Sequence, residues 1–269
     1  MRLISICPSN TELLAYLGLT SELVGIDDYS DWPEDIQDLP RLGPDLSIRM
    51  DEVEALQPDL VIASLSVPGM ERNIEELKKR GIPHIVYNPS TLADIAENLL
   101  DLGVRTSKEN EAKRIVQTYE QFIRTYEDHA AKIEPVRLYW EWWPKPVFTP
   151  GGLNWLTEIS KLAGGRNVYC DVELASVQTT WEDVYKKQPD HICLAWVGVR
   201  QDKVKPELLW KRADWPSLHA LQSNQVHVLE ESLYCRPSPR LLHGLKQLAA
   251  RLHPNVFPPD DGMDPILLK

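Results

Sequence analysis

The same local pattern occurs twice in this chain, and the second copy begins at residue 182, 131 residues after residue 51, where the first begins. In each copy an acidic pair opens a short helix-forming stretch, Gln-Pro-Asp interrupts it, and an apolar run rich in β-branched residues follows. Proline stops a helix, and such a short apolar run is typical of a buried parallel strand. The repeat therefore predicts two similar lobes, with a ligand site in a cleft between them.

Strand-like and helix-like stretches alternate in both halves, which predicts mostly parallel sheets. The expected strands cover residues 2–6, 24–26, 60–63 and 82–87 in the first half, and 136–139, 167–169, 192–197 and 226–229 in the second. Residues 107–133 contain neither Gly nor Pro, and their apolar residues recur at three- and four-residue steps, so a long helix is expected there.

These patterns predict an α/β fold of two Rossmann-like lobes with mostly parallel sheets, bridged by a single long helix. The expected boundaries are an N-terminal lobe over residues 1–105, a bridging helix over residues 106–134, and a C-terminal lobe over residues 135–269. The proline-rich tail after residue 254 is expected to be extended or irregular.

The bulk composition excludes several functions. A formal net charge of −11 without a basic run argues against nucleic acid and against an anionic membrane surface. Four widely spaced cysteines without Cys-x-x-Cys indicate free thiols, and the seven histidines show no metal-binding spacing. The sequence opens directly on a strand and has no run of about 18 apolar residues. We expect a cytoplasmic monomer, unless an export signal has been removed.

Catalytic motifs are missing from the expected turns. There is no Gly-x-Ser-x-Gly, no phosphate-binding Walker loop and no glycine-rich dinucleotide turn after the first strand. We therefore expect a binding protein rather than an enzyme, and no cofactor is required.

Ligands of parallel sheets bind beyond the carboxyl ends of the strands, so the loops after the strands carry the candidate ligand-binding residues. In the first half these are Ser9, Asn10, Tyr29, Trp32 and Ser64, and in the second half Trp140, Trp142, Trp143, Trp196, Leu233 and Tyr234. Three tryptophans within four residues, followed by prolines, suit a large, flat or apolar ligand. Packing inside a lobe is the alternative for each of these rings.

Several segments, in this order and spacing, resemble the cobalamin-binding substrate-binding proteins of bacterial ABC importers. Their wider family has two lobes bridged by one rigid helix and also carries siderophores and haem. The resemblance extends to about residue 253 and rests on residues 9–13 (Ser-Asn-Thr-Glu-Leu), 29–33 (Tyr-Ser-Asp-Trp-Pro), 58–63, 71–72, 81–82, 90–91, 148–151, 164–168 and 238–240 (Ser-Pro-Arg).

The resemblance implies that a corrin ring lies between the lobes, with Tyr29 and Trp32 on one side and the tryptophans of residues 140–143 facing them. It also places Leu233 and Tyr234 in a loop with an aromatic ligand contact. Glu71 matches a rim carboxylate that meets arginines of the membrane permease, and we assign Glu207 as its second-lobe counterpart.

Two other functions stay open at this point. One is a siderophore- or haem-binding protein of the same fold. The other is a cytoplasmic enzyme or regulatory protein that reuses the fold to handle a corrinoid, in which Asp31 or Glu141 would be essential.

Overall fold

The computed structural model describes residues 1–267, and the chain divides into two compact units. Unit 1 comprises Met1–Pro89 and Ala93–Thr118, and unit 2 comprises Ser90–Leu92 and the chain from Tyr119 onward. Helix α5 (Glu109–Ala130) contributes residues to both units. The lobe boundaries expected from the sequence stay predictions, and residues 268–269 of the expected second lobe lie outside the described residues.

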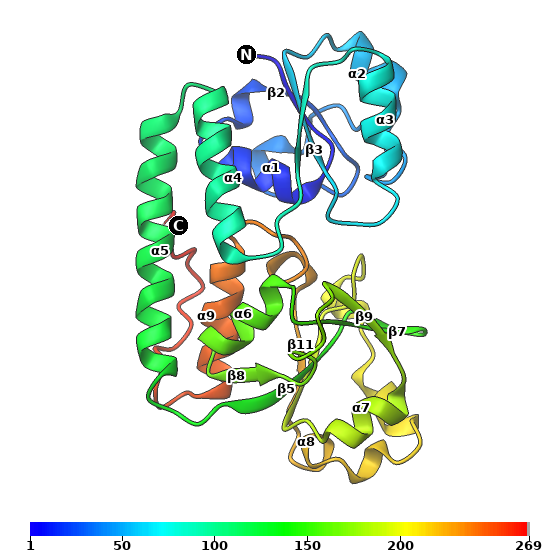
Figure 1. Ribbon diagram of the computed structural model, residues 1–269, viewed down its shortest axis with the longest axis vertical. Coiled ribbons are helices and arrows are strands. Elements are labelled where there is room, and N and C mark those ends of the chain that lie inside the picture. Colours follow the sequence, from blue (N-terminus) through cyan, green and yellow to red (C-terminus); the bar gives the residue numbers. More distant parts are fainter. Residues whose placement is uncertain (268–269) are drawn as a thin grey trace. The chain divides into compact units, whose positions relative to one another are not determined.

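Unit 1 contains a four-stranded sheet in the order β2-β1-β3-β4, and all neighbouring strands are parallel. Its strands are β1 (Leu3–Ser5), β2 (Leu23–Ile26), β3 (Leu60–Ser64) and β4 (His84–Tyr87), and its helices are α1 (Pro8–Tyr16), α2 (Met50–Ala55), α3 (Glu71–Lys79) and most of α4 (Leu92–Arg105). Figure 1 shows α1 and α4 on one side of the strands and α2 and α3 on the other.

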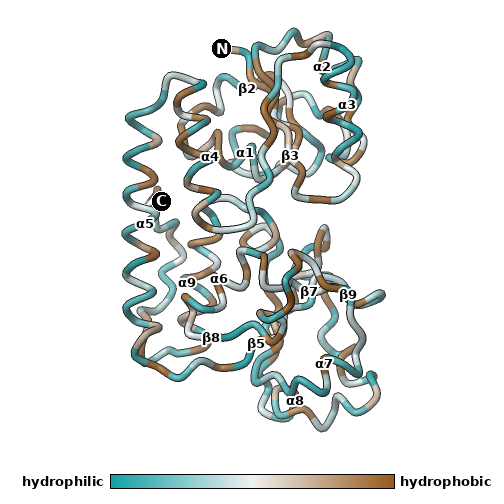
Figure 2. Tube along the Cα trace, in the orientation of Figure 1, coloured by the Kyte–Doolittle hydropathy of each residue, from teal (hydrophilic) through white to brown (hydrophobic). Residues whose placement is uncertain are grey.

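Both faces of this sheet are therefore covered, which explains why the inner strand β3 is a nearly continuous apolar run, whereas burial alternates along the edge strand β4. All five residues of β3 are buried. Figure 2 shows hydrophobic residues along these strands and mixed colouring along α5. The amphipathic pattern of α5 places Ala112, Ile115 and Tyr119 among the buried residues.

Unit 2 contains a second four-stranded parallel sheet, in the order β11-β10-β5-β8. When this order is read from β8 to β11, it matches the order of the first sheet: the second strand of the sheet in chain order comes first, then the first, the third and the fourth. Its strands are β5 (Val136–Glu141), β8 (Gly165–Asn167), β10 (His191–Leu194) and β11 (Val226–Val228), and its helices are α6 (Trp155–Leu162), α7 (Trp181–Lys187), α8 (His219–Gln222) and α9 (Leu241–Leu252). The expected α/β fold with two mostly parallel sheets is confirmed.

A third, antiparallel sheet in unit 2 was not expected from the sequence. It consists of β6 (Trp143–Pro144), β7 (Val147–Pro150) and β9 (Ser176–Thr179). The stretch 140–146, expected to be a loop, instead contains the end of β5 and all of β6. Because Pro144 lies in β6 and Pro146 lies beside it, the sequence showed no strand pattern there.

Other bounds also differ from expectation. Strand β5 extends two residues beyond residue 139. Strand β8 begins two residues before the expected stretch 167–169 and ends at its first residue. The long helix is shorter at both ends than residues 107–133, because Ser107 has a positive φ of 58° and the chain leaves the helix after Ala130.

The repeated Gln-Pro-Asp has the same structure in both units. Gln57 and Gln188 each end a short helix with φ of 47°, in the left-handed region. Two residues later, the Asp59 carboxylate accepts a hydrogen bond from the backbone N–H of Arg2 at 2.6 Å, and Asp190 accepts one from Arg137 at 2.8 Å. Each aspartate thereby ties its strand to the start of the neighbouring strand.

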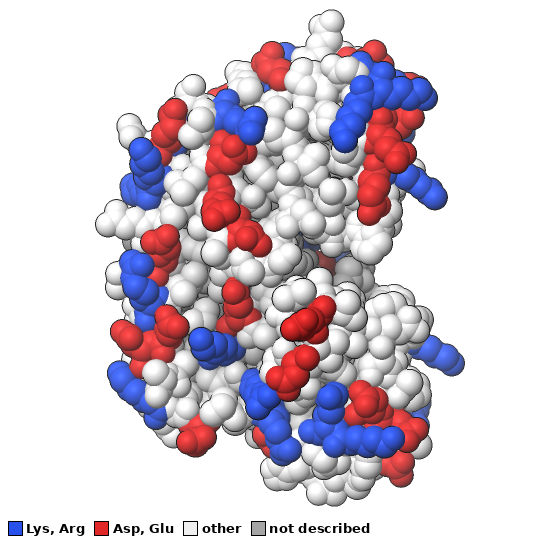
Figure 3. Space-filling model, in the orientation of Figure 1, with Lys and Arg blue, Asp and Glu red and all other residues white. Residues whose placement is uncertain are grey.

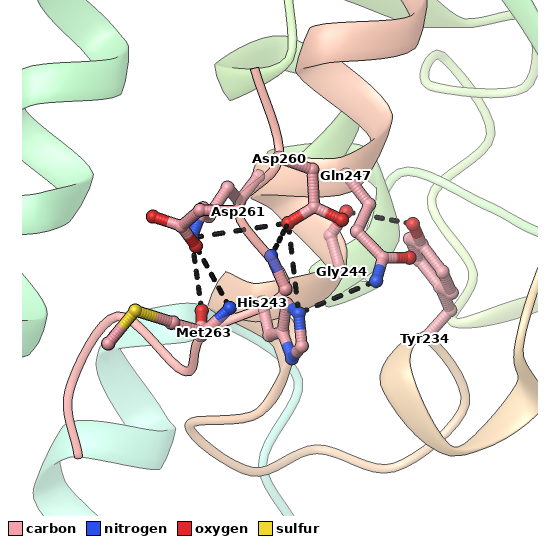
Figure 4. Close-up of polar contacts among 9 residues, drawn as sticks. Tyr234, His243, Gly244, Gln247, Asp260, Asp261 and Met263 are labelled. Carbon is pink, nitrogen blue, oxygen red and sulfur yellow. Dashed lines mark hydrogen bonds and ion pairs between the residues drawn. The ribbon is translucent and has the colours of Figure 1, made fainter. Parts of the chain in front are cut away.

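The proline-rich tail packs against α9 and α5. Phe257 is buried and stacks on Tyr126, with 5.3 Å between ring centroids. The buried Lys246 ammonium donates to a carboxylate oxygen of Asp261 and, at 3.0 Å, to the Met263 carbonyl oxygen. Figure 4 shows this cluster, in which Asp260 also faces His243. The tail is irregular, as expected, but it forms part of the core of unit 2.

The start of the unit 2 sheet contains a histidine pair, in which His191 is buried and His227 is half-buried. His191 Nδ1 and His227 Nε2 are 3.0 Å apart, and the rings stack. Burial lowers the pKa of His227 to about 4, with a smaller contribution from His191 and Arg251, and burial also lowers the pKa of His191. Among the other charges that face the pair, Asp190 raises the pKa of His191, whereas His219 and His253 lower it.

We predict that this pair makes unit 2 sensitive to acid. Because the unfolded histidines bind protons near their ordinary pKa of 6.5, stability is present above that pH and is lost as the pH falls from about 6.5 toward 4. Urea unfolding of wild type and His227→Gln should give a free-energy difference that shrinks over this interval. His84→Gln, which alters a histidine of unit 1, is the control. A pH-independent difference between wild type and His227→Gln would contradict the prediction.

Candidate functional site

The loop after β2 in unit 1 holds an exposed aromatic ring on a fixed backbone. The buried Asp27 carboxylate accepts hydrogen bonds from the backbone N–H groups of Tyr29 and Ser30, at 2.8 and 3.0 Å, and from the Ser30 hydroxyl. The Arg41 guanidinium also donates to the Ser30 carbonyl oxygen. Tyr29 is 53% exposed. A rigid loop with an exposed ring can contact a ligand without a large loss of conformational entropy.

Trp32, in the same loop, is half-buried, and its ring lies against Tyr16 with 5.5 Å between centroids. Two further apolar side chains in this part of unit 1 are exposed, Leu46 and Val67. Val67 follows β3 and was within the expected loop, whereas Leu46 precedes α2 and was missed. Nothing in its Pro-rich surroundings distinguished Leu46 from packing residues.

The polar candidates of unit 1 make bonds inside the unit. Ser9 and Asn10 lie in the first turn of α1 and are buried. The Asn10 amide donates to the Ala63 carbonyl oxygen at 2.9 Å, and Ser9 Oγ lies 3.3 Å from Cys7 Sγ. Ser64 is also buried, and its hydroxyl donates to Ser66. The ligand contacts expected for these three residues stay predictions, and the structure shows that each of their side-chain polar groups has a partner within unit 1.

Three candidates of unit 2 belong to the core. Trp140 is fully buried, its indole N–H donates to Ser160 Oγ at 2.8 Å, and its ring lies 5.5 Å from that of Tyr234. The Tyr234 hydroxyl donates to the Gly244 carbonyl oxygen at 2.8 Å, and Leu233 is also buried. The ligand contacts expected for these three residues stay predictions, and all three side chains are buried within unit 2. Trp140 is buried because β5 lies between β10 and β8 in the parallel sheet, whereas Leu233 and Tyr234 lie after β11, in the 3-10 helix Glu231–Leu233 and at its end.

A fully buried ion pair lies at the carboxyl end of β5. The Arg212 guanidinium donates to both carboxylate oxygens of Glu141, at 2.6 and 2.8 Å. The same carboxylate accepts from the Tyr139 hydroxyl at 2.9 Å and from Trp196 Nε1 at 3.2 Å. Burial raises the pKa of Tyr139 well above its usual value, so this hydroxyl stays protonated and can donate.

Two indole rings enclose the cation of this pair. The Arg212 guanidinium carbon lies 4.7 Å from the ring centroid of Trp181 and 4.3 Å from that of Trp215. Cation–π contacts are strongest when the cation is removed from water. Trp196, a predicted ligand contact, is buried and donates to Glu141, and its contact with a ligand stays a prediction. The partner of Glu141 is 71 residues away in sequence, so no local pattern could have indicated it.

Trp142 and Trp143 follow Glu141 directly. Trp143 is 41% exposed, and its indole N–H donates to the Lys145 carbonyl oxygen at 3.1 Å. Trp142 is half-buried and packs near Trp155, with 6.4 Å between centroids. Leu153, Leu174 and Val197 are exposed apolar residues of unit 2 that the sequence did not single out. Unit 2 thus presents one exposed indole and several aliphatic side chains around the end of β5.

The two carboxylates expected to meet a permease are both exposed. Glu71 begins α3 and accepts a hydrogen bond from the Gly69 N–H at 2.7 Å. Glu207 lies in the 3-10 helix Pro206–Lys211, beside the half-exposed Trp210. On the face shown in Figure 3, acidic and basic side chains are interspersed. The contact of either carboxylate with a permease stays a prediction.

Other classes of site find no support in the described part of the chain. No group of three or more His, Cys, Asp or Glu residues among residues 1–267 could hold a metal ion. All four cysteines are free, as expected. No described helix is long and apolar enough to cross a membrane.

We predict that Arg212→Met lowers the free energy of unfolding by about 3–5 kcal/mol, because it leaves the Glu141 carboxylate buried without a counter-charge. Adding Glu141→Leu should restore much of this loss, and urea unfolding measures both effects. Lys186→Met, which breaks the exposed pair with Glu182, should have no measurable effect. An Arg212→Met variant as stable as Lys186→Met would refute the prediction.

Comparison with known proteins connects these features to a family. Residues 3–233 match the family described as periplasmic binding protein. The vitamin B12-binding protein of Vibrio parahaemolyticus is 28% identical over 245 residues, which cover 91% of this chain and 86% of that protein.

Two solved structures illustrate the similarity of fold. The periplasmic vitamin B12-binding protein of Vibrio cholerae has a TM-score of 0.77 and 27% identity, covering 93% of this chain and 96% of that one. A periplasmic haem-binding protein of Pseudomonas aeruginosa has a TM-score of 0.84 and 22% identity, covering 95% of this chain and 93% of that one. Since these proteins are described as periplasmic, the comparisons do not support the cytoplasmic location expected from the N-terminal sequence.

Proposed function

The chain belongs to the periplasmic binding protein family, and we propose that it binds a corrinoid, a cobalamin-like ligand, without catalysing a reaction on it. The observation that carries this proposal is the similarity to vitamin B12-binding proteins over more than 90% of the chain. A binding protein of this family would deliver its ligand rather than change it.

The surfaces of the two units support a large ligand with apolar faces. Unit 1 offers Tyr29 with Leu46 and Val67, and unit 2 offers Trp143 with Val197. Exposed aromatic rings on fixed loops are typical anchors for flat ligands. That the ligand lies between the lobes stays a prediction.

Haem is the second candidate ligand, because the fold is also similar to that of a haem-binding protein. Haem carries two carboxylates, which favour free cations at the binding surface. In the loop after β11, Arg236 lies 3.5 Å from Glu231, and after β10, Arg200 lies 3.1 Å from Asp202. Because these arginines are already paired with carboxylates, they favour a ligand with an uncharged periphery over a ligand with carboxylates at its periphery.

We predict that purified protein binds cyanocobalamin at micromolar concentration or tighter, which calorimetry and quenching of tryptophan fluorescence would detect. Tyr29→Ala should weaken binding about 5–30-fold, since it removes an exposed aromatic anchor. Trp210→Ala, an exposed tryptophan outside the candidate loops, should bind like wild type. Absence of heat and of quenching at micromolar ligand would exclude cobalamin, and tighter binding of haemin would select the second candidate.

We also propose that Glu71 and Glu207 contact arginines of an ABC permease, as the sequence resemblance implies. Glu71→Lys and Glu207→Lys should retain ligand affinity but lose most stimulation of ATP hydrolysis by the cognate permease in vesicles, because like charges would then face each other. Glu97→Lys, an exposed change on α4, is the control. Full stimulation by the double variant would refute this docking role.

A further inference from the structure

A network of buried hydroxyl groups joins helix α1 to the loop that carries Tyr29. The hydroxyl oxygen of Thr11, on α1, lies 2.8 Å from that of Ser5, at the end of β1, and 2.7 Å from that of Ser30, in the loop after β2. The Ser30 hydroxyl in turn donates to the Asp27 carboxylate. The four side chains of this hydroxyl network are buried, and they come from three segments that are separate in the sequence.

The backbone is fixed on both sides of Tyr29. On one side lies Ser30, which belongs to the hydroxyl network and whose carbonyl oxygen accepts from the Arg41 guanidinium. On the other side, the Asp28 N–H donates to the Gly43 carbonyl oxygen at 2.9 Å, and the Asp28 carboxylate accepts from the Gly43 N–H at 3.0 Å. Both neighbours of Tyr29 are therefore bound to other segments of unit 1.

The Tyr29 side chain has no such support of its own. Among residues 1–267, no hydrogen bond, ion pair or ring contact holds it, and it is 53% exposed. The position of the ring therefore depends on the backbone of residues 28–30. A ring whose backbone is already fixed loses less conformational entropy on binding than a ring on a mobile loop. Contacts that fix this backbone therefore favour binding even where they lie far from the ligand.

We infer that Thr11 is a positioning residue for ligand binding, which acts through Ser30 on the Tyr29 ring. Thr11 is fully buried, so it does not touch a ligand itself. The bonds to the Asp27 carboxylate come from the loop's own residues. Thr11 instead ties the loop to α1 and, through Ser5, to the end of β1. This inference rests on the proposed function, because it takes Tyr29 as a ligand contact.

Thr11→Val tests the inference, because valine has a similar shape but no hydroxyl, so Ser30 loses a buried hydrogen bond. We expect the Kd for cyanocobalamin to increase about 3–10-fold, since the Tyr29 ring must then be ordered on binding. Thr11→Ser keeps the hydroxyl and should bind within about twofold of wild type.

Thr106→Val is the matched control. Thr106 is also a buried threonine of unit 1, and its hydroxyl donates to the Leu102 carbonyl oxygen at 2.7 Å, at the end of α4. This variant loses a comparable hydrogen bond outside the hydroxyl network, so its Kd should stay within about twofold of wild type. A Kd raised equally in Thr106→Val and Thr11→Val would reduce the effect to general destabilisation of unit 1 and would overturn the inference.

A double-mutant cycle shows whether Thr11 acts through the ring. In the Tyr29→Ala background, Thr11→Val should change the Kd by less than about twofold, because the ring that it positions is absent. The same loss of affinity in both backgrounds, or an unchanged Kd in Thr11→Val alone, would overturn the inference while corrinoid binding stands. Failure of wild type to bind cyanocobalamin would instead overturn the proposed function together with the inference.

Amide hydrogen exchange of the ligand-free protein provides a readout of the loop itself. The N–H groups of Tyr29 and Ser30 donate to Asp27, so they should exchange faster in Thr11→Val than in wild type. In Thr106→Val they should exchange at the wild-type rate. Equal exchange of these two amides in Thr11→Val and wild type would show that Thr11 does not fix the loop, and it would overturn the inference whatever the ligand.

Discussion

Each unit depends on one aspartate that ties two parallel strands together at their beginning. Asp59 and Asp190 accept a hydrogen bond from the first residues of the neighbouring strand, and their own N–H groups donate back to the same residues, Arg2 and Arg137, at 2.9 Å. Strand register decides which side chains reach the carboxyl end of a sheet. The loops that follow β1 and β3 in unit 1, and β5 and β10 in unit 2, are therefore set by contacts made at the opposite ends of these strands.

Different contacts fix the loops at the carboxyl ends of the strands in the two units. In unit 1, hydrogen bonds from the loop backbone to Asp27 leave Tyr29 exposed. In unit 2, the buried Glu141–Arg212 pair lies at the carboxyl end of β5, and the antiparallel sheet follows β5 in the chain. A buried ion pair adds little net stability, but its directional bonds can fix one arrangement of the segments that it joins.

The repeated fold could be predicted from the sequence, because Gln-Pro-Asp before an apolar run determines local structure that a reader can recognise. The exposure of individual aromatic residues could not. Trp140 and Trp143 lie three residues apart in one segment, yet one is buried beside Tyr234 and the other is exposed. The difference depends on where β5 ends and on helices that pack over it, which are long-range contacts. The pairing of Glu141 with Arg212 is hidden for the same reason.

The position of the tail has a consequence for how the chain is made. Phe257 and Ile266 are buried in unit 2, and Asp261 neutralises the buried Lys246 of α9. Before residues 257–266 leave the ribosome during synthesis, the aromatic face of α5 in unit 2 is uncovered, and the Lys246 ammonium of α9 has no partner from the tail. Folding of this half therefore finishes only after residues 257–266 have been synthesised, whereas the sheet of unit 1 is complete once β4 has emerged.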